Sequence, residues 1–130
     1  MDLFAEHTSA KVARFYSRHW CPGTLGVDSY SHPWAADPAT GARELGYANG
    51  DFSRMGDTLA KVKAERADCV VVYPEWPRYW QVLWRDLPVQ EVITLPRLPD
   101  LCRPGVRVDT NKASGRPPNY PLKVAFIFWE

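Results

Sequence analysis

The sequence has little cysteine, almost no net charge and no long apolar run, and each shortage excludes a class of protein. Only 3 of its 130 residues are cysteine, and no two of them form a Cys-x-x-Cys pair. A disulfide scaffold is therefore excluded, and a reducing, intracellular location (cytoplasm or nucleus) is expected. The formal net charge is +1, so the overall field does not indicate a nucleic-acid partner. No apolar stretch approaches the about 18 residues of a membrane span, and no secretory signal is expected.

What is present is typical of a globular chain of one domain, residues 1–130. Hydrophobic residues make up 45% of the sequence and charged residues 24%, which is enough apolar material for one modest core. Proline is frequent, with 12 residues. Because proline interrupts helices, this content argues against a helical bundle and favours short elements joined by turns.

The apolar pattern predicts alternating strands and helices in the middle of the chain. After the turn "YANGDFSRMGD", Met55, Leu59 and Val62 recur on one face of a helix, and "DCVVVYP" then reads as a strand covered on both faces. A second helix is expected from Pro77 and a further strand over "QEVITLP", and "MDLFA" and "TLGVDSY" are candidate strands. The final "LKVAFIFW" is a last strand, either antiparallel at an edge or inserted in the sheet. Right-handed crossovers then predict an α/β fold, a small Rossmann-like layer with a mostly parallel sheet.

The turn "NGDF" has two interpretations. Asn-Gly-Asp is a common turn sequence, and an ordinary loop explains it. Alternatively, it is a catalytic turn that holds the exocyclic amine of a flipped-out base. In that case the Asn49 side chain and the Gly50 carbonyl accept hydrogen bonds from the amine, and Phe52 stacks on the base.

Four segments occur in one order and carry a family resemblance: "DLFAEHTSAKVARFYS", "VDSYSHPW", "NGDF" and "VVVYPEWPRYWQVLW". Together they resemble the phage-type Dam family of DNA N6-adenine methyltransferases, in the version found at the end of polyproteins of DIRS-type tyrosine-recombinase retroelements. The resemblance covers about residues 2–96 and implies a methyltransferase-type layer that uses S-adenosylmethionine. It also implies the roles of individual residues: Asp2, Phe4 and Asp28 in cofactor binding, and Asn49, Gly50 and Phe52 in catalysis.

The sequence departs from this family in its catalytic turn. Gly50 and Asp51 stand where the family has two stiffening prolines, and no glycine-rich loop follows "DLFA". Glycine adds freedom where rigidity is needed, and Asp51 adds a negative charge. We therefore expect a degenerate, non-catalytic module that binds nucleic acid (DNA or RNA) or protein, including other domains of a polyprotein. The alternative is an active S-adenosylmethionine-dependent DNA adenine N6-methyltransferase.

A Pro- and Arg-rich loop is predicted at about residues 96–121. Residues 95–123 contain six basic and two acidic side chains, a charge of +4 that leaves −3 for the rest of the chain. Such a loop either contacts phosphates or is simply solvated. The candidate nucleic-acid contacts are Arg97, Arg103, Arg107, Lys112 and Arg116.

Aromatic and metal-ligating residues complete the candidate sites. Trp80 and Trp84 lie at helical spacing and are expected in the core. Ligands gather at the carboxyl ends of strands in open α/β sheets, so the pocket candidates are Tyr73, Pro74 and Trp76. The spacing of the histidines and Cys21 fits no zinc finger, and no metal site is predicted.

Overall fold

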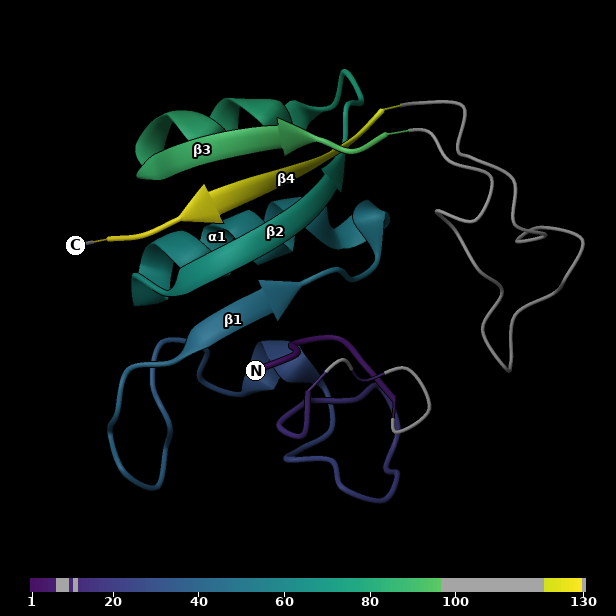
Figure 1. Ribbon diagram of the computed structural model, residues 1–130, viewed down its shortest axis with the longest axis vertical. Helices are drawn as coiled ribbons and strands as arrows, with labels where there is room; N and C mark the ends of the chain where they lie inside the picture. The colour runs from purple at the N-terminus through teal and green to yellow at the C-terminus, as the bar shows by residue number, and fades with distance from the viewer. Residues whose placement is uncertain (7–9, 11, 97–120, 130) are drawn as a thin grey trace, which may run out of the picture.

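The computed structural model describes residues 1–6, 10, 12–96 and 121–129, which form a small α/β fold around one four-stranded sheet (Figure 1). The strands lie in the order β1, β2, β4, β3. Their bounds are Leu45–Ala48 for β1, Asp68–Pro74 for β2, Val89–Thr94 for β3 and Leu122–Ile127 for β4. The helices are α1 (Met55–Glu65) and three 3₁₀ helices, η1 (Ser29–Ser31), η2 (Phe52–Arg54) and η3 (Tyr79–Asp86).

The prediction of a Rossmann-like, mostly parallel sheet is wrong, because the sheet is mixed and mostly antiparallel. β1 and β2 pair in parallel, whereas β4 pairs antiparallel with both β2 and β3. The last strand lies between β2 and β3, so these two strands do not pair with each other and two antiparallel ladders take the place of one parallel ladder. An apolar run such as "LKVAFIFW" fits an edge or an internal position equally well, so its pattern could not decide between them.

The two earliest strands expected from the sequence are reduced to isolated bridges. Asp2 forms single parallel bridges with Phe15 and with Tyr47, and Ser17 forms one with Val27. The helix expected after Pro77 is a 3₁₀ helix, η3. Short apolar segments separated by polar residues supply too few alternating positions to build full ladders, and the chain here runs as irregular structure beside β1.

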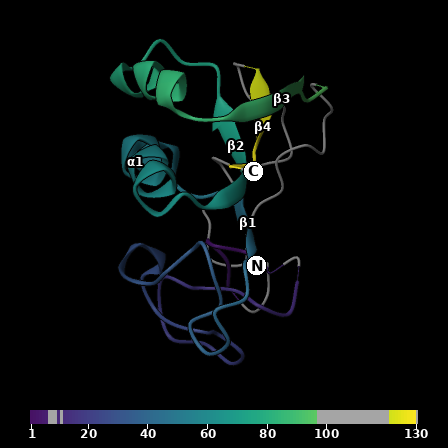
Figure 2. The same cartoon turned by 90° about the vertical axis from the view of Figure 1, so that its left-hand side faces the viewer.

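The sheet is covered on one side by α1 and η3 (Figure 2). The face of α1 that carries Met55, Leu59 and Val62 is buried, as its spacing predicted, and it joins the same core as Val71 of β2. The helix ends at Arg66, whose left-handed backbone (φ 52°) lets its N–H bond to the carbonyls of the last turn.

Trp34 is one of the buried residues before β1 that join this core. The Trp34 side chain is fully buried, and its indole N–H donates to the Ser29 carbonyl oxygen at 3.0 Å. Its backbone N–H donates to Glu65 Oε1, at the end of α1, at 2.8 Å. One tryptophan thus links the amino-terminal loops to the helix that lines the sheet. No helix within the described ranges has the length and apolar character to cross a bilayer.

Candidate functional site

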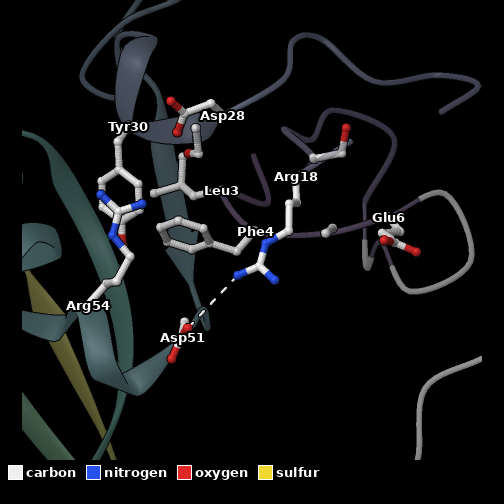
Figure 3. A pocket seen from close by; sticks show the side chains of 11 residues that line it. Leu3, Phe4, Glu6, Arg18, Asp28, Tyr30, Asp51 and Arg54 are labelled. Carbon is white, nitrogen blue, oxygen red and sulfur yellow. Dashed lines mark ion pairs between the residues drawn. The ribbon is translucent and has the colours of Figure 1, made fainter. Parts of the chain in front are cut away.

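A cavity of about 530 Å³ opens between the amino-terminal segment, η1 and the turn before α1 (Figure 3). This volume falls within the range of small-molecule sites, roughly 300–1,000 Å³. The lining residues come from four separate segments: Leu3, Phe4, Ala5 and Glu6; Ser17 and Arg18; Asp28, Ser29 and Tyr30; Asp51 and Arg54. Segments distant in sequence therefore converge on one concave surface.

Asp2 fixes the path of the first lining segment. Its side chain is buried, and Oδ1 accepts a hydrogen bond from the Phe4 backbone N–H at 3.2 Å. The next residue, Leu3, donates its backbone N–H to the Tyr47 carbonyl at 2.9 Å, at the end of β1. Asp2 does not itself line the cavity; it positions the backbone from which Phe4 projects. Its predicted role in cofactor binding is therefore at most indirect in this geometry.

Aromatic rings form one wall. The rings of Phe4 and Tyr30 lie 5.2 Å apart, and Phe4 meets the buried Trp34 edge-on at 5.7 Å. The Arg54 guanidinium lies over the Tyr30 ring, 3.8 Å from its centroid. The Tyr30 hydroxyl shares a 2.9 Å hydrogen bond with Thr58 of α1, while burial raises the pKa of Tyr30. This wall is fixed from both the amino-terminal segment and the helix.

Asp28 presents a carboxylate to the cavity from an uncommon backbone conformation. Its φ is 60°, in the left-handed region that few residues other than glycine adopt. The Asp28 carbonyl accepts hydrogen bonds from both the N–H and the hydroxyl of Ser31, which holds the turn. Among the described residues, the carboxylate itself has no hydrogen-bond or ion-pair partner. Asp28 is exposed, so its carboxylate can be reached by a ligand from solvent.

Asp51 is the one residue of the "NGDF" turn that lines the cavity. Its Oδ1 accepts hydrogen bonds from the N–H of Ser53 at 2.9 Å and from the Ser53 hydroxyl at 2.8 Å, which caps η2. These hydrogen bonds lower the pKa of Asp51, with smaller help from nearby arginines. Its Oδ2 faces Arg18 at 3.9 Å across the cavity (Figure 3). Asp51 is therefore ionised at neutral pH.

The residues expected to be catalytic point elsewhere. The Asn49 amide nitrogen donates to the Tyr47 hydroxyl at 3.2 Å. Phe52 packs edge-on against Trp76, with ring centroids 5.8 Å apart. Gly50 lies so close to the Phe4 ring that a β-carbon would come within 2.7 Å of it. None of the three lines the cavity, although they lie within a few residues of it along the chain.

The other predicted sites are dispersed. Tyr73 and Pro74 are buried, and the Tyr73 ring contacts Trp80 and Trp84 in the core beneath η3. The predicted nucleic-acid residues, Arg97, Arg103, Arg107, Lys112 and Arg116, lie outside the described residues, as does most of the Pro- and Arg-rich loop. Within the ranges described, no group of three or more potential metal ligands occurs.

Sequence reasoning missed three residues that shape the cavity, namely Arg18, Tyr30 and Arg54. Two of them could have been inferred from their position next to predicted site residues. Tyr30 follows Asp28 by two positions, and Arg54 closes the turn that begins at Asn49. Arg18 could not be inferred, because only the fold brings it opposite Asp51. Comparison of the chain with protein-family models, with curated proteins and with solved structures finds no match. The cavity itself must therefore carry the functional argument.

Proposed function

We propose that this chain is a non-catalytic binding module, related to N6-adenine methyltransferases, that holds a nucleoside-type ligand in the cavity. The resemblance implies S-adenosylmethionine as that ligand. One observation carries the proposal: Phe4 and Asp28, which the resemblance assigns to the cofactor, line the same cavity as Asp51 of the turn. An aromatic face and an unpaired carboxylate suit a base and a hydroxylated sugar.

The state of the turn supports loss of catalysis. Methyl transfer to an amine needs oxygens aimed at the N–H groups and an aromatic ring free to stack on the base. Here Phe52 is packed against Trp76, so its ring is not free to stack on a base, and the ionised Asp51 occupies the cavity side. This arrangement can bind a ligand, but it does not orient an adenine amine for methyl transfer.

The test is a calorimetric titration of S-adenosylmethionine, with a methyl-transfer assay on adenine-containing DNA alongside. We expect saturable binding and no transferred methyl group. Phe4→Ala and Asp28→Asn should each weaken binding about tenfold, since each removes one contact of roughly 1.4 kcal/mol. Asp86→Asn, which removes an exposed carboxylate of η3 outside the cavity, should not. Absence of saturable binding at millimolar ligand would overturn the proposal.

A nucleic-acid partner and an intracellular location belong to the same proposal. The support is the charge of +4 on residues 95–123 of a chain whose total is +1. We expect Arg103→Ala with Arg107→Ala to abolish the mobility shift of DNA or RNA. The double variant Lys63→Ala and Arg85→Ala removes the same charge from α1 and η3 and should leave the shift intact. A mobility shift that persists in the Arg103 and Arg107 variant would exclude the loop as the contact. If the unaltered chain shifts neither DNA nor RNA, a protein partner from the same polyprotein is the remaining binding partner.

An active adenine N6-methyltransferase is the second candidate. It is favoured by one observation, the exposure of Asn49 beside an aromatic pair, Phe52 and Trp76, at the edge of the turn. Transfer of labelled methyl groups to adenine by the unaltered chain would establish it. The double variant Gly50→Pro and Asp51→Pro tests whether restoring the two prolines of the turn restores methyl transfer. The nearby Phe4 ring must move to accept a proline at position 50.

A further inference from the structure

We infer that the Asp51 carboxylate makes the cavity selective for an organic cation, so that it binds a sulfonium ligand in preference to the neutral thioether. This inference deepens the proposed function and rests on it. Its basis is the position of the carboxylate, which lines the cavity beside the Phe4 ring and across from Arg18 (Figure 3). In the two forms of such a ligand the base, sugar and amino-acid parts are identical, and only the methyl group and the charge at sulfur differ.

The charges that line the cavity favour a cation. Asp28 and Asp51 line the cavity with the guanidiniums of Arg18 and Arg54, and Arg54 is also paired outside the cavity with Asp57, at 3.1 Å. These three carboxylates and two guanidiniums carry a formal charge of −1. A ligand that carries phosphates would enter a negative field, whereas a cationic ligand is attracted to it. The cavity is therefore unsuited to a nucleotide and suited to a positively charged nucleoside derivative.

Asp51 is available to such a ligand because only one of its two carboxylate oxygens is held by short hydrogen bonds. Ser53 fixes one carboxylate oxygen with two hydrogen bonds of 2.9 and 2.8 Å, from its N–H and its hydroxyl. The other oxygen faces Arg18 at 3.9 Å, and the Arg18 side chain is 74% exposed. An exposed ion pair of this length contributes little. A ligand cation can displace Arg18 without disturbing the cap.

An aromatic face lies on the same side as this carboxylate. The Arg54 guanidinium already covers the Tyr30 ring at 3.8 Å. The half-buried Phe4 ring contacts Tyr30 and Trp34, so a ligand meets only the part of this ring that lines the cavity. Figure 3 shows this ring between the Tyr30 side of the cavity and the Arg18–Asp51 pair. A carboxylate beside an aromatic face is a recurring way to recognise sulfonium and ammonium groups, because both attract positive charge after desolvation.

The experiment compares S-adenosylmethionine with S-adenosylhomocysteine by calorimetry on the complete chain. We expect the unaltered protein to prefer the sulfonium by about fivefold or more, the effect of one unit charge near a carboxylate in a hydrated site. Asp51→Asn should remove the preference by weakening only the sulfonium ligand. Asparagine also caps helices, so the turn is expected to stay folded, and circular dichroism verifies this. The matched control, Asp86→Asn, removes a carboxylate that pairs with a lysine of α1 and should keep the preference.

The outcomes separate the two proposals. If neither ligand binds, the proposed function fails. If both ligands bind the unaltered chain equally, or if Asp51→Asn keeps the preference, the ligand site stands and the inference about charge is wrong. Arg18→Gln gives a second measurement: removal of the competing cation should increase the preference for the sulfonium, and a decrease would overturn the inference.

Discussion

At the scale of single residues, the contact between Gly50 and Phe4 connects the turn to the cavity wall. A β-carbon on residue 50 would lie 2.7 Å from two atoms of the Phe4 ring, one of them the ring atom bonded to its β-carbon. The ring cannot yield by a simple end rotation, because its inner atoms are the ones in contact. Glycine at this position is thus required by the close approach of another side chain, whatever freedom it also gives the turn.

Gly50→Ala is therefore expected to lower the free energy of unfolding by about 1–3 kcal/mol, the usual cost of overpacking. It should also weaken ligand binding, since Phe4 must leave its place in the wall. Chemical denaturation and calorimetry measure the two effects. Phe4→Leu supplies the control. In the Phe4→Leu background, Gly50→Ala should lower the free energy of unfolding much less. Full additivity of the two substitutions would contradict the steric explanation.

Cys69 lies at the start of β2 and is fully buried. Desolvation raises the pKa of its thiol to about 12. Because only the thiolate is nucleophilic, we expect Cys69 to resist alkylation by iodoacetamide at pH 8 in the folded protein and to react after denaturation. Peptide mass spectrometry of the two samples identifies the site. Rapid labelling of Cys69 under native conditions would show that β2 opens to solvent.

At the scale of secondary-structure elements, Asp68 ties the start of β2 to two other segments. Its carboxylate accepts hydrogen bonds from Arg43 at 3.0 and 3.1 Å and from the Trp129 backbone N–H, after β4, at 3.0 Å. The hydrogen bond from the Arg43 side chain is the main reason that the pKa of Asp68 is lowered, and the Trp129 N–H contributes. A depressed carboxyl pKa stabilises the fold above the unfolded value of about 3.9, and this contribution disappears as the pH falls through the folded value.

We expect the free energy of unfolding to fall as the pH drops below about 4, and Asp68→Asn to reduce that fall. At pH 7 the variant should lose about 1 kcal/mol, since hydrogen bonds to a charged group are replaced by weaker ones. Urea denaturation between pH 3 and pH 7 measures both effects. Asp86→Asn, which breaks an exposed pair with Lys63, should change neither. An unchanged pH profile in Asp68→Asn would show that other carboxyls control acid stability.

The elements that the sequence predicted well are those with long, strong patterns. The helix after the turn, the strand "DCVVVYP" and the strand "QEVITLP" correspond to α1, β2 and β3. Strand direction and position are not encoded in such patterns, so the sequence left an antiparallel edge and an inserted position open for β4, which lies between β2 and β3. The segments around Asp2 and Val27 form single bridges because each pairs through one or two residues held by tertiary contacts.

The residues of the cavity also divide into those that the sequence indicated and those that it did not. Phe4 and Asp28 came from the family resemblance, and both line it. Arg18 could not be found from the sequence, since its place in the cavity depends on how irregular loops fold back, which no local periodicity describes. Tyr73 and Pro74 were expected in a pocket at the end of a strand, but η3 and its tryptophans cover this position and bury both residues.

At the scale of the whole molecule, the described residues form a regular layer and an irregular half, the residues before β1, which packs against it. Figure 2 shows α1 and η3 on one side of the sheet and the residues before β1 gathered at its β1 end. The irregular half contains one short 3₁₀ helix, η1, among the described residues. Few backbone groups there are tied into ladders, so its stability depends on a small number of buried side chains. The cavity lies at the junction of the two parts.

Trp34 is one of these side chains, and it contacts both parts. It is fully buried and meets the Phe4 ring edge-on at 5.7 Å. Trp34→Ala should cost about 3–5 kcal/mol, as expected for a large aromatic removed from a core. The loss should concentrate in the irregular half, so hydrogen exchange should accelerate in residues before β1 far more than in β2 and β4.

Ligand binding should fall with it, since Phe4 and Tyr30 both pack against Trp34. Trp129→Ala is the matched control: its indole donates to the Ala67 carbonyl at 3.0 Å, and it does not line the cavity. This variant should lower the stability of the sheet while the folded fraction keeps its affinity. Equal loss of affinity in both variants, or accelerated exchange throughout the chain in Trp34→Ala, would mean that the two parts unfold as one unit. Retained affinity in Trp34→Ala would mean instead that the cavity is held by contacts within the amino-terminal loops themselves.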